Sequence, residues 1–109
     1  MGSKMRSILL LLLSLPTLVL AEPRAENGGG YVPPNGFVPD AKTAISIAVA
    51  IWEPIYGAKQ IQSERPFKAK LVEGVWHVEG TLPSGTPGGV AEARISKADG
   101  RVVYVMHGM

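Results

Sequence analysis

The stretch from residue 37 to residue 57, FVPDAKTAISIAVAIWEPIYG, constrains the fold of this chain more than any other segment. Asp40 follows a proline and precedes good helix formers, so its carboxylate can accept the first free N–H groups of a helix. Pro54 lacks an N–H group and should kink or loosen the last turn, and Gly57 favours the left-handed conformation that ends a helix. The apolar residues recur at spacings of three and four and form one stripe: Ala44, Ile47, Ala48, Ile51, Trp52, Ile55 and Tyr56. The segment therefore predicts a helix that packs one face against another layer.

The first 21 residues have the organisation of a secretory signal peptide. A positively charged start is followed by an apolar core over residues 8–15, and Pro16 then interrupts the run. We expect cleavage between Ala21 and Glu22, and therefore a periplasmic protein. An uncleaved membrane anchor is the alternative, but the apolar run is short, whereas a spanning helix needs about 20 apolar residues.

The charge balance changes once this segment is set aside. The whole chain has 11 basic and 9 acidic residues, but Lys4 and Arg6 belong to the signal segment, which leaves nine basic against nine acidic residues. This neutral balance indicates neither a nucleic-acid footprint nor a polybasic membrane patch, so we expect no nucleic acid and no membrane partner after cleavage. The 88 residues that remain of 109 suffice for one small core, and the absence of cysteine excludes a disulfide framework.

Beyond the cleavage point, the composition separates a linker from one domain. Residues 22–36 are rich in Gly, Pro and Asn and predict a flexible linker, so the single domain should span residues 37–109. Residues 59–66 are polar and are interpreted as a connector. Alternating or β-branched patterns then predict four strands, at residues 67–72, 75–82, 90–96 and 101–107. The order predicts an α+β domain in which one long N-terminal helix packs on a four-stranded antiparallel meander sheet.

Glu73 and Gly74 form a two-residue turn that determines the register of the first hairpin. The predicted pairs are Val72 with Val75, Leu71 with Trp76, Ala69 with Val78, and Phe67 with Gly80. Lys68 then lies opposite Glu79 and Lys70 opposite His77 on the face away from the helix, which suits water or a partner. The predicted core contains Trp76, Ile51, Ile55, Phe67, Leu71 and Ile95.

No segment carries a recognisable catalytic constellation. There is no cysteine nucleophile, no serine lies in a nucleophile elbow, and His77 and His107 are not at metal-ligand spacing. The loop at residues 83–89 lacks the helix and lysine of a phosphate cradle. We therefore predict a non-enzyme with no catalytic residue, no metal site and no cofactor. The candidate partner-binding residues are Lys68, Lys70, His77, Glu79, Tyr104 and His107, for which a solvated sheet face is the alternative explanation.

Five motifs occur in order along residues 37–108: the Val-Pro-Asp helix start, Trp-Glu-Pro-Ile-Tyr-Gly, Pro-Phe-Lys-Ala, Trp-x-Val-x-Gly-Thr-Leu, and Gly-Gly-Val-Ala followed by Ile-Ser-Lys-x-Asp-Gly. Together they resemble the bacterial immunity proteins of the nuclear-transport-factor-2-like fold that occur in polymorphic toxin systems. The resemblance implies a protein that binds and neutralises a cognate toxin in bacterial competition, with no catalytic residues to carry over. Because the chain is short, it implies a reduced nuclear-transport-factor-2-like or cystatin-like domain.

A second class of protein also fits the helix-plus-sheet pattern. A periplasmic binding or inhibitory module of the PepSY type uses a similar Ile-Ser-Lys-x-Asp-Gly hairpin and would regulate a peptidase or a sensor. A toxin gene beside this one would favour immunity, and a peptidase or sensor kinase gene would favour the PepSY-like module.

Overall fold

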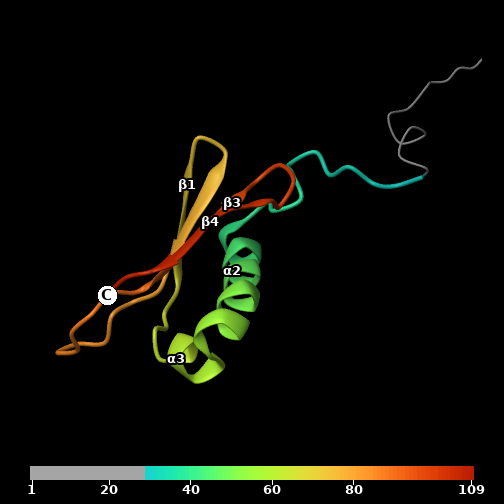
Figure 1. Ribbon diagram of the computed structural model, residues 1–109. Helices are drawn as coiled ribbons and strands as arrows, with labels where there is room; N and C mark the ends of the chain where they lie inside the picture. The colour runs from blue at the N-terminus through green and yellow to red at the C-terminus, as the bar shows by residue number, and fades with distance from the viewer. Residues whose placement is uncertain (1–28) are drawn as a thin grey trace, which may run out of the picture. The chain divides into compact units, whose positions relative to one another are not determined.

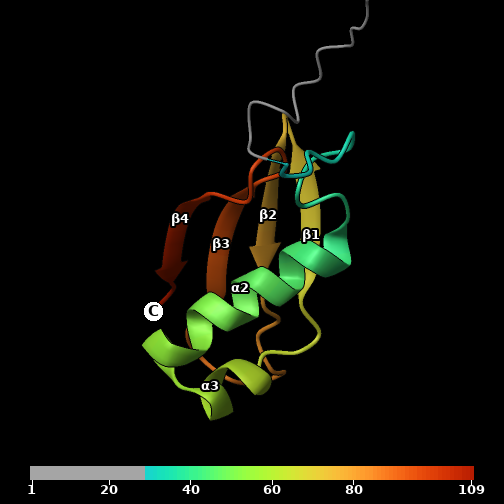
Figure 2. The same cartoon turned by 90° about the vertical axis from the view of Figure 1, so that its right-hand side faces the viewer.

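The computed structural model describes residues 29–109, so the predicted signal peptide and residues 22–28 of the predicted linker lie outside the described residues. The compact unit extends from Pro33 to Met109. Its elements are α2 (Ala41–Tyr56), α3 (Ala58–Gln62), β1 (Lys68–Val72), β2 (Val75–Glu79), β3 (Ala91–Ser96) and β4 (Val102–His107). The strands form one antiparallel sheet in the order β1-β2-β3-β4. Helix α2 crosses one face of this sheet, and no described element covers the other face (Figures 1 and 2). The predicted α+β architecture is confirmed.

Helix α2 begins as the sequence predicts. The backbone N–H of Thr43 donates to Asp40 Oδ1 at 2.8 Å, and the hydroxyl of Thr43 donates to the same oxygen at 2.6 Å. The helix continues through Pro54 and ends at Tyr56. Gly57 has a positive φ of 97°, but its ψ of 136° is extended rather than left-handed helical. The chain is therefore redirected into a second helix.

This second helix, α3, was not predicted. It occupies the stretch that the sequence analysis assigned to a polar connector, and the segment is not fully exposed: Ile61 is 0% and Glu64 1% accessible to solvent. Apart from Ile61, residues 59–66 carry no large aliphatic side chain, so no apolar periodicity marks the helix. Its place below α2 is determined by tertiary packing (Figure 2).

The register of the first hairpin is confirmed along all five pairs of β1 and β2, from Lys68 with Glu79 to Val72 with Val75. Glu73 and Gly74 have φ values of 49° and 79°. Positive φ at both positions is the geometry of the two-residue turn that matches the twist of a hairpin. The predicted pairing of Phe67 with Gly80 falls just beyond the bounds of the two strands.

The core lies between α2, α3 and the inner face of the sheet, and it differs in part from the prediction. Trp76 and Ile95 are buried as expected, and Ile51 and Phe67 are partly buried. The prediction was wrong for Ile55 and Leu71, which are 58% and 44% exposed. Ile55 lies in the last turn of α2, and Leu71 lies in an edge strand next to the β1–β2 turn. The buried apolar residues are Val38, Ala44, Ala48, Trp52, Ile61, Trp76, Val78, Ala91, Ala93 and Ile95.

Candidate functional site

The outward face of the sheet, on the side away from α2, carries two rows of side chains, most of them polar. The strand register places four residues side by side across all four strands, and we call them the basic row: Lys70, His77, Arg94 and Tyr104. Their neighbours along each strand, such as Trp76 and Ala93, are buried on the helix side. Because successive side chains of a strand point to opposite faces, the basic row points away from the core.

The second row lies two residues further along each strand. We call it the mixed row: Lys68, Glu79, Glu92 and Met106. A hollow of about 240 Å³ is lined by residues of both rows, including Lys70, Arg94 and Glu92. The guanidinium carbon of Arg94 lies 4.7 Å from the centre of the Tyr104 ring, which is cation–π geometry. Within residues 29–109, neither Lys70 nor Arg94 forms an ion pair.

The structure brings together five of the six candidate partner-binding residues. Lys68, Lys70, His77, Glu79 and Tyr104 all belong to the two outward rows. His107 does not join them, because it pairs with Ala91 on the helix-facing side of the sheet and contacts Glu64. The expectation that His107 extends the outward patch was therefore wrong. Whether any of these residues binds a partner stays a prediction.

Sequence reasoning missed Arg94 and Glu92 as members of this surface. The alternation of residues 90–96 predicts that both lie on the polar side of the third strand, on the face away from Ala91 and Ala93. The sequence does not determine how β2 and β3 pair, because the loop at residues 80–90 is too long for turn geometry to set the register. The alternation of the third strand was the only available signal.

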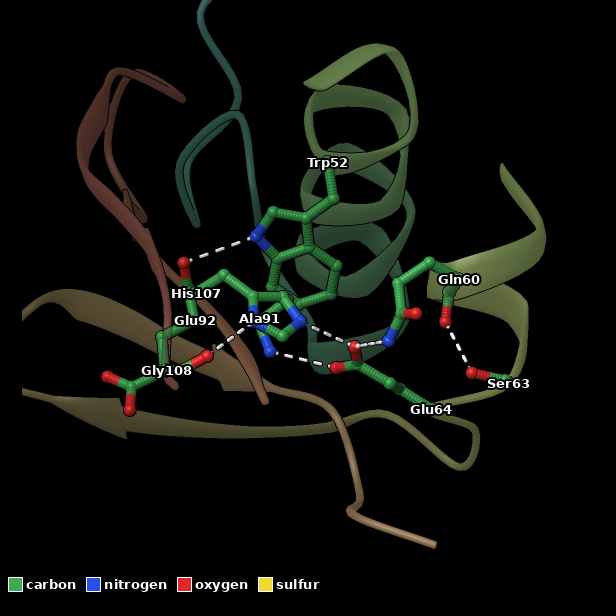
Figure 3. A network of polar contacts seen from close by, with 8 residues as sticks. All are labelled: Trp52, Gln60, Ser63, Glu64, Ala91, Glu92, His107 and Gly108. Atoms are coloured by element: carbon green, nitrogen blue, oxygen red, sulfur yellow. Dashed lines mark hydrogen bonds and ion pairs between the residues drawn. The ribbon is translucent and has the colours of Figure 1, made fainter. Parts of the chain in front are cut away.

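A second polar cluster lies on the other side of the sheet, around the carboxylate of Glu64 (Figure 3). Its Oε1 accepts the backbone N–H of Ala91 at 2.8 Å, and its Oε2 accepts the amide of Gln60 at 2.9 Å and lies 2.7 Å from His107 Nε2. Gly80 makes room for this group, since a Cβ at that position would lie 2.6 Å from Glu64 Oε1. The carboxylate thus joins α3, β3 and β4.

The contacts of His107 indicate a protonated ring. Nε2 faces a carboxylate oxygen, and Nδ1 lies 2.8 Å from the carbonyl oxygen of Gly108, so both nitrogens face acceptors and both must donate. The hydrogen bond to Glu64, with the bond to Gly108, raises the pKa of His107 against the opposing effect of burial. Burial raises the pKa of Glu64, but the hydrogen bonds from Ala91, Gln60 and His107 outweigh it, and the pKa is lowered.

A hollow of about 300 Å³ adjoins this pair, between α3, residues 82–89 and the C-terminal end. The Glu64 carboxylate already accepts three hydrogen bonds from the protein, and His107 uses both ring nitrogens. We therefore interpret the Glu64–His107 pair as a structural contact that holds α3, β3 and β4 together. In the described part of the chain, no group of three or more histidine, cysteine or acidic side chains could hold a metal ion, and no helix is long and apolar enough to cross a membrane.

Comparison with known proteins supplies the family. A family model described as NTF2 fold immunity protein matches residues 43–109. The match begins in the first turn of α2 and includes α3, all four strands and both outward rows. Searches of curated proteins and of solved structures found no match. Because the family model covers more than half of the chain, and the helix-on-sheet architecture agrees with it, this chain belongs to the NTF2 fold immunity protein family.

Proposed function

We propose that this protein neutralises a cognate bacterial toxin in the periplasm by binding it stoichiometrically, without turning over a substrate. The observation that carries the proposal is the family match over residues 43–109, since an immunity protein protects a cell from a toxin. The signal-like first 21 residues support a periplasmic site of action.

The outward face of the sheet is the surface that we propose for toxin binding. The helix-facing side is occupied by α2 and the core, whereas the outward side is uncovered by any described element (Figure 1). Arg94 and Tyr104 belong to this face, and arginine and tyrosine are enriched among the residues that dominate binding at protein interfaces. Binding there would obstruct the toxin without any chemistry by the immunity protein.

Co-expression tests the proposal directly. A candidate toxin domain, taken from a gene found next to the one for this protein, is directed to the periplasm, and growth is measured with and without the full-length immunity protein. We expect restored growth and a complex of the two proteins that co-purifies at a defined stoichiometry. The matched control is the same protein without residues 1–21, which should remain in the cytoplasm and fail to protect. If the wild-type protein neither restores growth nor co-purifies with the toxin, the immunity proposal is wrong, and a PepSY-like regulatory module becomes the better account.

A further inference from the structure

We infer that the toxin presents an acidic segment, with at least two carboxylates, along the basic row of the outward face. This inference rests on the proposed function and specifies the chemistry of the partner at that surface. It requires the partner's acidic groups to meet Lys70 and Arg94, with His77 between them.

The basic row is not neutralised by the protein itself. Lys70, His77 and Arg94 lie directly opposite one another on three successive strands, and no acidic residue shares their row. Since the described residues provide no ion-pair partner for Lys70 or Arg94, the row carries unsatisfied positive charge. A partner with carboxylates at this position would supply the complementary charge.

The geometry of Arg94 favours a carboxylate as its ligand. The guanidinium lies over the face of the Tyr104 ring, at 4.7 Å from its centre. Stacking on an aromatic ring limits the rotation of the planar group and leaves its N–H edge available for a bidentate contact. Arg94 and Tyr104 therefore form a preorganised anchor at the β3–β4 end of the row.

The spacing of the strands determines how far apart the carboxylates should be. Neighbouring strands lie roughly 4.8 Å apart, so Lys70 and Arg94, which are separated by one strand, are about 10 Å apart at the backbone. Two acidic side chains of one extended segment, at alternate positions, have a separation of roughly 7 Å and can reach both groups.

The mixed row determines the orientation of the partner. Glu79 and Glu92 lie two residues along their strands from the basic row, at a distance of roughly 7 Å. They would repel the same acidic segment if it shifted by one row. These two carboxylates also disfavour a nucleic acid or a free phosphate, whose negative charge would extend over both rows. The hollow between the rows can receive one side chain of a protein partner.

The test is a charge reversal with a matched control. The variant carries Lys70→Glu and Arg94→Glu, and the control carries Lys42→Glu and Lys59→Glu, which make the same change in net charge at exposed positions of α2 and α3. Binding of the neighbouring-gene toxin is measured by calorimetry at about 50 mM and 300 mM salt, where screening lengths differ by more than a factor of two. We expect the row variant to bind about 100-fold more weakly and to lose most of the salt dependence, and the control to stay within about threefold of wild type. Thermal melts and circular dichroism should show that all proteins remain folded.

Reversal of the toxin's own acidic residues then identifies the contact. A toxin variant in which two acidic residues are changed to lysine should bind the row variant better than it binds the wild-type protein. If the wild-type protein does not bind the toxin, the proposed function and this inference both fail. If the wild-type protein binds and the folded row variant binds equally well, only the acidic-segment inference is overturned.

Discussion

Replacing Glu64 with alanine should remove the interaction that joins α3, β3 and β4. The buried backbone N–H of Ala91 would lose its only acceptor, and an unsatisfied buried donor costs about 1–3 kcal/mol. His107 would lose its carboxylate, and breaking a buried charge pair costs about 3–5 kcal/mol. Because the side chain of His107 is 21% exposed and can reach water, losing the ion pair should cost less than that range, and we place the total of both losses at about 3 kcal/mol. For a domain of this size the melting temperature should fall by roughly 12–24 °C.

The same pair predicts a pH dependence with a definite sign. The pKa of Glu64 is lowered from 4.5, so its contribution is present above pH 4.5 and is lost as the pH falls through the lowered value. The pKa of His107 is raised from 6.5, so its contribution is complete below pH 6.5 and is lost as the pH rises through the raised value. The difference in unfolding free energy between wild type and Glu64→Gln should therefore be largest between these two ordinary values and should shrink at alkaline pH.

Chemical denaturation of both proteins between about pH 4 and pH 9 measures this difference. Glu53→Gln is the matched control, because Glu53 also accepts a hydrogen bond, from Gln62 at 2.6 Å, but forms no ion pair with a histidine. The control should differ from wild type by less than about 1 kcal/mol, and it should lack the decrease at alkaline pH that the Glu64–His107 ion pair produces. A Glu64→Gln difference that does not change with pH would refute the Glu64–His107 ion pair.

Three further predictions concern the core, a close approach and export. Trp76→Ala should cost about 3–5 kcal/mol because it empties a buried aromatic site, and melts of this variant and wild type that differ by only a degree or two would contradict the burial. Trp76→Phe should cost only about 1–2 kcal/mol, since the phenyl ring refills most of the site but leaves the Val38 carbonyl without the indole N–H that donates to it at 2.8 Å. Gly80→Ala should cost about 1–3 kcal/mol because the new Cβ would lie 2.6 Å from Oε1 and 2.9 Å from the Cβ of Glu64. Only part of this cost should disappear in a Glu64→Ala background, which removes the carboxylate but keeps that Cβ; equal costs in both backgrounds would show that the carboxylate contact is not responsible. Protein released by osmotic shock should have the intact mass of a chain that begins at Glu22, whereas a full-length species retained in the membrane would indicate an uncleaved anchor.

The sequence alone was sufficient wherever the deciding interactions are local. Asp40 caps its own helix through a residue three positions away, and Glu73 and Gly74 determine a hairpin in which every partner lies within 11 residues. In such segments the backbone geometry of a cap or a two-residue turn follows from the residues themselves. The faces of the strands then follow from alternation, and alternation correctly placed five of the six candidate residues on the outward face of the sheet.

Only the tertiary structure decided the features that depend on residues far apart in the chain. Helix α3 forms in a polar segment because Ile61 and Glu64 find partners in the rest of the fold, and Glu64 meets His107 across 43 positions. The β2–β3 register, which brings Arg94 into line with Lys70 and His77, follows a loop too long to impose one. The way in which α2 packs on the sheet leaves Ile55 of the helix and Leu71 of β1 exposed to solvent. Local sequence patterns specify which way a side chain points along its own element, but burial and partner choice depend on how the elements pack together, and that depends on the whole chain at once.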